Sequence, residues 1–292
     1  MKLWHMLLIW SAICIGLLAT VGRSATKPVG LWLNASSLAA DACDYKALGF
    51  SELVVLLPDK GQSLFTGSAT QSGLLDAVHA VKVRANGLPV AVAVWCFNEQ
   101  ASWGTNPDTH ALGIWTAAQW TTGFKTRLGW LADACAAEGV GLALDAECYA
   151  LTGGGNGGKM SVNAAWKAPG LKQRAQEFRV IAKKAAWTCF YVWGGELARL
   201  EGLDDWFTGC KKLEFWDEEF TSGSSYSRTR SRAASLGGVG SAGCWFPALA
   251  TYKASDIRAT LEDRIGRAGA AWWYDPSGEV RKNQDLVRKA LR

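Results

Sequence analysis

Two acidic residues stand two positions apart at the end of a short apolar run, where carboxylate chemistry is possible. The apolar run 141–144 leads into Asp145 and, after one alanine, Glu147. Alternate side chains of a β-strand share a face, so the two carboxyl groups are expected to point the same way. An acid inside a hydrophobic strand is costly unless it is paired, hydrogen-bonded or at a wet end. The pattern therefore indicates the mouth of a pocket.

Paired carboxyl groups of this kind suit general acid catalysis. Repulsion between two close carboxylates raises the pKa of one of them, which keeps that group protonated and able to donate. Glycoside hydrolysis needs such a donor together with a second group that attacks, activates water or stabilises the oxocarbenium ion. Glu147, with the longer side chain nearer the strand end, is the expected acid and Asp145 its partner. The alternative is a hydrogen-bonded network of the two acids without catalysis.

Further acids and many aromatic residues end other strand-like runs. Asp217 and Asp275 are candidates for the supporting carboxylate. Indole faces stack on the apolar C–H faces of sugar rings, so aromatic residues beside acids suit a carbohydrate ligand. The alternative for any one of these aromatic residues is a place in the core. The candidate substrate-binding residues are Trp32, Trp95, Tyr149, Trp193, Trp216, Trp245 and Trp273.

The elements that must position these residues alternate regularly along the chain. Strand-like runs begin near residues 30, 52, 89, 141, 188, 212, 243 and 270, about 34 residues apart on average, with helical runs such as 73–86 and 115–138 between them. Eight such units predict an α/β fold, a closed (β/α)8 (TIM) barrel, as a single domain over residues 29–292. Its C-terminal mouth would collect the strand ends. An open doubly wound sheet is the structural alternative.

The N-terminus has the layout of a secretory signal peptide, which we expect to occupy residues 1–25. Lys2 precedes the apolar block 3–18, and small residues fill positions 19–25. This predicts a secreted or periplasmic protein without a stable membrane span after cleavage; an uncleaved anchor is the alternative, although the block is short for a span. Loss of Lys2 and Arg23 lowers the formal net charge from +5 to +3, too little to indicate a nucleic-acid partner.

Cysteine and histidine usage argues against metal and histidine chemistry. Only His79 and His110 follow the leader, and the seven remaining cysteines include no C-x-x-C pair, so no metal site and no cofactor are expected. Disulfides are permitted in an oxidising compartment but are not specified by these spacings. Carboxylates remain the groups available for catalysis.

The run Leu144–Glu147 resembles the end of the acid-strand motif of the chitinase-like family 18 glycoside hydrolases, D-x-x-D-x-D-x-E on the fourth barrel strand. Phe215–Asp217 is similar to that family's aromatic residue followed by Asp on strand six. The resemblance implies that Glu147 is the proton donor, that Asp145 positions a substrate acetamide, and that Trp273 floors the subsite. Val140 and Ala143 stand where the pattern has Asp, and Trp216 where it has Tyr.

These observations together predict a secreted glycoside hydrolase that cleaves a polysaccharide or glycan. Two alternatives from other classes remain open. One is a lectin-like barrel that binds carbohydrate without cleaving it, which the missing Asp at positions 140 and 143 favours. The other is an exported structural or scaffold protein. Fold class does not decide among the three.

Overall fold

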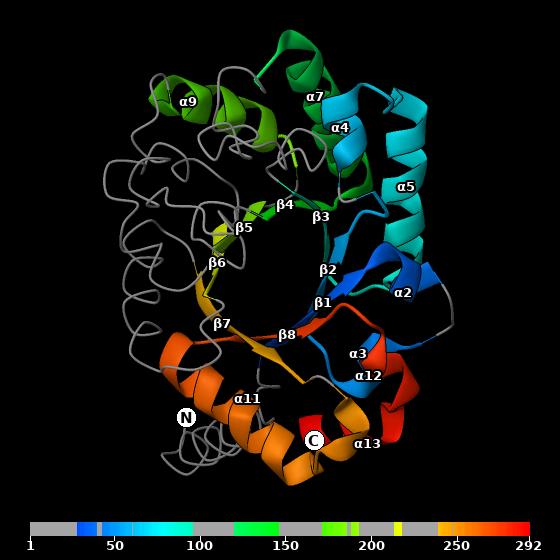
Figure 1. The fold of residues 1–292 in the computed structure, drawn as a ribbon, viewed down its shortest axis with the longest axis vertical. Helices are drawn as coiled ribbons and strands as arrows, with labels where there is room; N and C mark the ends of the chain where they lie inside the picture. The colour runs from blue at the N-terminus through cyan, green and yellow to red at the C-terminus, as the bar shows by residue number, and fades with distance from the viewer. Residues whose placement is uncertain are drawn as a thin grey trace, which may run out of the picture.

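The computed structural model shows a closed barrel of parallel strands surrounded by helices (Figure 1). It describes residues 28–39, 43–59, 61–95, 120–145, 171–185, 188–192, 213–217, 239–246 and 248–292. The barrel closes in the order of the chain, β1 to β8, with β8 pairing back to β1. The prediction of a (β/α)8 barrel is confirmed, and the open doubly wound sheet is wrong because an open sheet has two unpaired edges.

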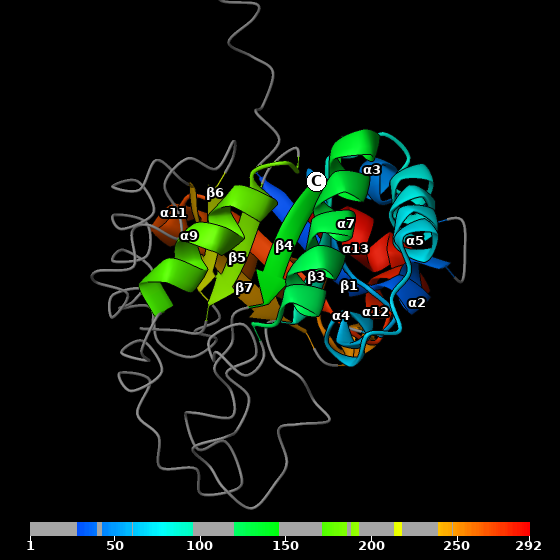
Figure 2. The ribbon, with the colours of Figure 1, turned by 90° about the horizontal axis from the view of Figure 1, so that it is seen from above.

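The strands are β1 (Val29–Asn34), β2 (Glu52–Leu56), β3 (Val90–Trp95), β4 (Gly141–Asp145), β5 (Thr188–Val192), β6 (Leu213–Asp217), β7 (Val239–Trp245) and β8 (Ala271–Asp275). The helices are α2 (Ala35–Ala39), α3 (Tyr45–Leu48), α4 (Gln62–Thr66), α5 (Gln71–Arg84), α7 (Thr122–Glu138), α9 (Leu171–Ala182), α11 (Ala254–Ala268), α12 (Glu279–Lys282) and α13 (Gln284–Leu291), with a 3-10 turn, η5, at Leu249–Thr251. In Figure 2, which is turned by 90°, α5 and α7 run along the outside of β3 and β4.

The chain enters β4 through a tight turn that sets where the acid strand begins. Gly139 follows α7 with φ of +64°, the left-handed conformation that glycine adopts most readily, and its N–H donates to Ala136. The N–H of Val140 then donates to the carbonyl of Cys135 at 2.8 Å. The start of α7 differs from the prediction. Thr121 accepts a hydrogen bond from the N–H of Phe124, and this cap places the first helical residue at Thr122.

The seventh strand also begins earlier than the sequence pattern predicts. It starts at Val239 rather than Gly243, and Val239 pairs with Glu214 of β6. Glycine and serine in this stretch weaken the local strand signal. Pairing with β6 extends the start of the strand regardless of that weak propensity, whereas pairing with β8 begins only at Ala242.

The buried side chains form two separate clusters, one on each face of the barrel wall. Side chains that point outward pack under the helices, and this outer cluster contains Leu31, Val55 and Trp273. Side chains that point inward fill the interior, and this inner cluster contains Trp32, Val54, Leu56, Ala91, Ala93, Ala143 and Trp272, with Tyr274 packed against them. The alternation of strand side chains decides which cluster each residue joins.

The indole of Trp272 lies inside the barrel and packs directly against Gly30 of β1. A Cβ added at Gly30 would meet Trp272 ring atoms at 2.5 Å. Such a contact forces the ring or the strand to move. Glycine at this position is therefore a packing requirement.

We expect Gly30→Ala to lower the free energy of unfolding by about 1–3 kcal/mol, the cost of overpacking a filled core. Urea denaturation followed by circular dichroism measures this change. Gly129→Ala in α7 is the matched control, since an added Cβ there meets nothing within 4 Å and alanine favours a helix. Equal midpoints for Gly30→Ala and the wild type would contradict the packing argument.

Cys43, Cys135 and Cys244 are buried, and Cys135 and Cys244 are free thiols. Burial raises the pKa of the Cys244 thiol to about 12 and raises that of Cys135 as well. Both thiols therefore stay protonated and unreactive. Among the described residues, no helix is long and apolar enough to cross a membrane.

Candidate active site

On each strand one position is the last on the inward face of the wall, and these eight positions lie at the C-terminal mouth of the barrel. The register identifies these positions, because residues paired across parallel strands share a face and Ala93 pairs with Ala143 inside the barrel. We call them the rim positions. They are Asn34, Leu56, Trp95, Asp145, Tyr191, Trp216, Trp245 and Tyr274. One acid and five aromatic residues thus share this end of the barrel.

Asp145 occupies the rim position of β4. It is paired with Trp95 of β3 and Tyr191 of β5, and it lies on the face that carries Ala143. The strand ends at this residue, so Asp145 stands where barrel enzymes keep their chemistry. Its predicted partner Glu147, and also Tyr149 and Trp193, lie outside the described residues.

Aromatic residues lie at the rim positions of β7 and β8 and, on β1, two residues before the rim position Asn34. Trp245 of β7 pairs with Tyr274 of β8, and Tyr274 pairs with Trp32 of β1. The rings of Trp32 and Tyr274 meet edge to face, with centroids 6.4 Å apart and an interplanar angle of 69°. Trp32 is 3% exposed, Tyr274 is half-buried and Trp245 is 48% exposed. Two of the predicted sugar-binding tryptophans, Trp32 and Trp245, therefore lie close together.

Trp273 lies on the other face of the barrel wall. It is 1% exposed, and its ring packs edge to face on Phe50 and Phe246 at centroid distances of 5.9 and 4.8 Å. The expectation that Trp273 floors a sugar subsite does not fit this placement. The period of two along β8 turns Trp272 and Tyr274 inward and Trp273 toward the helices.

Asp275 serves the backbone rather than the mouth. Its side chain is 3% exposed, and its two oxygens accept hydrogen bonds from the N–H groups of Glu279 (2.7 Å) and Val280 (3.0 Å) at the start of α12. This carboxyl satisfies helix N–H groups that have no partner within the helix. The expectation that Asp275 is a supporting catalytic carboxylate does not fit this role.

Asp217 and Trp216 lie on opposite faces of β6. Trp216 is a rim position, whereas Asp217 pairs with Ala242, which in turn pairs with Ala271 of the outer cluster. In the register, Asp217 therefore does not share the strand face of the rim position Trp216. Its catalytic role stays a prediction.

Tyr274 and Asn34 are rim residues that the sequence interpretation did not single out. The signal was present, because both follow from counting in twos from Trp32 and Trp272 along their strands. Asn34 donates a hydrogen bond from Nδ2 to the carbonyl of Pro276 at 2.9 Å. This bond ties the end of β1 to the loop that follows β8.

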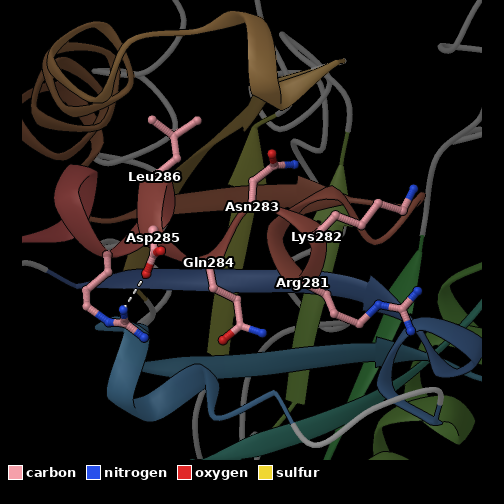
Figure 3. Close-up of a pocket in the computed structure, with 7 residues that line it drawn as sticks. Arg281, Lys282, Asn283, Gln284, Asp285 and Leu286 are labelled. Atoms are coloured by element: carbon pink, nitrogen blue, oxygen red, sulfur yellow. Dashed lines mark hydrogen bonds and ion pairs between the residues drawn. The ribbon is translucent and has the colours of Figure 1, made fainter.

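A polar hollow on the outside of the barrel is distinct from this mouth. It has a volume of about 470 Å³ and lies on α12 and α13, where its lining includes Arg281, Lys282 and Arg288 (Figure 3). Lys282 is paired with Glu279, and Arg288 with Asp285, each at 2.8 Å. None of the predicted site residues lines it. In the described part of the chain, no three His, Cys, Asp or Glu side chains gather to hold a metal ion.

The buried carboxyl of Asp275 predicts a pH dependence of stability. Burial raises its pKa above the ordinary value, and the hydrogen bonds from Val280 and Glu279 only partly offset this. A carboxyl group whose pKa is higher in the folded state than in the unfolded state contributes its full stabilisation at pH values below its unfolded pKa of about 3.9. This stabilisation is lost as the pH rises through the pKa of the folded state. Asn at this position does not titrate.

We therefore expect the difference in the free energy of unfolding, Asp275→Asn minus wild type, to become more positive as the pH rises from 4 to 7. Urea denaturation of both proteins at the two pH values measures this, and carboxyl groups common to both cancel in the difference. A difference that is independent of pH, or that shifts toward the wild type, would contradict the argument.

Comparison with known proteins identifies the fold and no family. The chain matches no family model, and no curated protein is detectably similar to it. It is similar in structure to GH5_18 from Streptomyces cattleya in complex with GlcNAc, with a TM-score of 0.55 and 12% identity over 92% of this chain and 80% of that one. A GH30 endoxylanase from Clostridium papyrosolvens C71 has the same TM-score and identity, over 91% of this chain and 72% of that one.

A third similar structure is D-psicose 3-epimerase in the presence of D-fructose, with a TM-score of 0.51 and 10% identity over 89% of this chain and 96% of that one. Structures that share this barrel therefore include both glycoside hydrolases and an epimerase. At such low identity the likeness shows the fold alone, and one fold hosts several chemistries. The chain is an α/β protein with the barrel architecture of these enzymes.

Proposed function

We propose that this protein is a secreted glycoside hydrolase that cleaves a polysaccharide or glycan at the C-terminal mouth of the barrel. The observation that carries the proposal is the rim itself, where Asp145 shares the barrel interior with aromatic residues from neighbouring strands. Aromatic faces bind sugar rings, and an adjacent carboxyl group supplies the proton chemistry that cleavage of a glycosidic bond requires.

Within this proposal Glu147 protonates the leaving oxygen, and Asp145 orients the substrate and raises the pKa of Glu147 by repulsion. The resemblance of 144–147 to the acid strand of family 18 enzymes supports these two roles. The rim position of Asp145 supports them too, since Glu147 follows two residues later. Neither Asp217 nor Asp275 is part of the proposed mechanism.

Export is part of the proposal and rests on the leader-like layout of residues 1–25. A secreted or periplasmic location suits an enzyme whose substrate is a polymer too large to enter a cell. It would be tested by sequencing the N-terminus of protein recovered from medium or periplasm. Recovery of uncleaved protein in the membrane fraction would favour the anchor.

A lectin-like barrel that binds carbohydrate without cleaving it is the second candidate. One observation favours it, namely that the carboxyl group of Asp275 binds the N–H groups of Glu279 and Val280 and is not available as a supporting catalytic acid. With Val140 and Ala143 in place of acids, Asp145 and Glu147 would have to supply all the carboxylate chemistry. Such a barrel would retain the aromatic rim.

Reducing-sugar release from a panel of polysaccharides by the mature protein distinguishes the two candidates. The panel contains β-glucan, xylan, mannan, chitin, peptidoglycan fragments and polygalacturonate. The hydrolase proposal predicts release from at least one of them. Binding of a polysaccharide with no release from any member would overturn the hydrolase proposal in favour of the lectin-like barrel, and neither binding nor release would remove both.

A further inference from the structure

Three aromatic side chains on consecutive strands form what we call the aromatic wall: Trp245, Tyr274 and Trp32. β8 is hydrogen-bonded to both other strands, and Tyr274 pairs with Trp245 of β7 on one side and with Trp32 of β1 on the other. Neighbouring strands lie about 4.8 Å apart, so the three positions extend over about 10 Å. That span is longer than one pyranose ring.

Exposure increases in steps along the aromatic wall. Trp32 is 3% exposed, Tyr274 is half-buried and Trp245 is 48% exposed. The register explains why Trp245 is so open: β6 ends opposite Ala242, whereas β7 continues to Trp245. Trp245 therefore lies beyond the last paired residue of β6, and about half of its surface is exposed.

Trp245 differs from the other large apolar side chains that are exposed in the described part of the chain. Leu75 and Val83 lie on α5 and Val180 on α9, on the outer surface of the barrel. Trp245 is instead the last residue of β7, where it pairs with Tyr274 of β8. A half-exposed tryptophan costs hydrophobic free energy that a bound apolar surface would recover.

Two members of the aromatic wall, Trp32 and Tyr274, are held in place by their neighbours. Trp32 packs edge to face on Tyr274, and Trp272 fills the interior beneath them beside Gly30. Asn34 ties the end of β1 to Pro276 after β8. Trp32 and Tyr274 therefore lose little side-chain freedom when a ligand binds beside them.

The charges at the eight rim positions, all of them in the described part of the chain, favour one kind of sugar. The rim positions contain one acid, Asp145, and no basic residue. An anionic sugar polymer is normally recognised through arginine or lysine and would be repelled by a carboxylate. A neutral ring presents C–H groups to indole without that repulsion.

We propose that the aromatic wall is the principal sugar subsite and that it takes a pyranose ring of a neutral oligosaccharide, stacked on Trp245. The proposal rests on the proposed function for its place at the mouth, and it adds the substrate class and the strands on which the sugar lies. Uronate-rich and sulfated polymers are excluded as ligands of this subsite.

Affinity electrophoresis through gels that contain β-glucan, xylan, glycol chitin or polygalacturonate tests the proposal. We expect at least one neutral polymer to retard the wild type and polygalacturonate not to do so. Trp245→Ala should raise the apparent Kd by about tenfold or more, because it removes the stacked face. Trp245→Phe should keep much of the binding. Val83→Ala, which removes an exposed apolar side chain on α5, should bind like the wild type.

Equal retardation of Trp245→Ala and the wild type, retardation by polygalacturonate alone, or no retardation by any polymer would overturn the subsite. Thermal unfolding of each variant separates lost binding from lost folding. The two proposals fail separately. If Trp245→Ala still hydrolyses the polymer with an unchanged KM, the subsite proposal is wrong and the hydrolase proposal stands. If binding depends on Trp245 but no polymer is hydrolysed, the hydrolase proposal is wrong and the subsite proposal stands.

Discussion

Glu147→Gln is expected to lower the rate of polysaccharide hydrolysis by about a hundredfold or more, the usual loss when a general acid is removed. This corresponds to roughly 2.7 kcal/mol of transition-state stabilisation. Glutamine has nearly the shape of glutamate but no proton to donate to the leaving oxygen, so binding should change little while kcat falls. Initial rates on the polymer that the wild type cleaves best measure the effect.

Leaving-group dependence separates a general acid from a residue that only supports the fold. An aryl glycoside with an acidic phenol needs little protonation, so Glu147→Gln should lose much less activity on it than on the polymer. Glu138→Gln is the matched control, because Glu138 lies at the end of α7 beside His79, 3.0 Å from its ring nitrogen. It should keep full activity. Equal losses on both substrates, or none, would remove Glu147 from the proton-donor role.

Trp273→Ala is expected to lower the free energy of unfolding by about 3–5 kcal/mol, the range for deleting a buried aromatic side chain. The free energy of unfolding of an ordinary domain is about 5–15 kcal/mol, so the expected loss is a large share of it. The physical reason is the cavity left between Phe50 and Phe246, both of which pack on the indole ring. Urea denaturation measures the change.

Trp273→Phe keeps an aromatic ring in the same space and should cost less than Trp273→Ala, which keeps the test valid if the alanine variant does not fold. Trp245→Ala is the comparison on the opposite face, and it should cost little stability because Trp245 is 48% exposed. Wild-type stability in Trp273→Ala together with weakened sugar binding would support the original expectation that Trp273 faces the mouth.

The repeating units and the acid strand were predictable from the sequence because their signals are local. Strand and helix periods recur along the chain, and Gly139 and Thr121 mark the turn and the cap that bound α7. The weak seventh strand was the exception, since its length depends on pairing with β6 and β8 rather than on its own residues. Local propensity does not contain that pairing.

The number of strands, their approximate ends and the kinds of residue near those ends follow from local patterns in the chain. The face of the wall that each residue occupies depends instead on the tertiary structure. Trp272, Trp273 and Tyr274 are adjacent in the chain, and the closure of the barrel sends the first and third inward and the second under the helices. From its place in the sequence Asp275 is likewise a candidate catalytic acid, whereas in the folded protein its carboxyl group accepts hydrogen bonds from N–H groups at the start of α12. A one-residue step along a strand reverses the face, and long-range pairing sets that register.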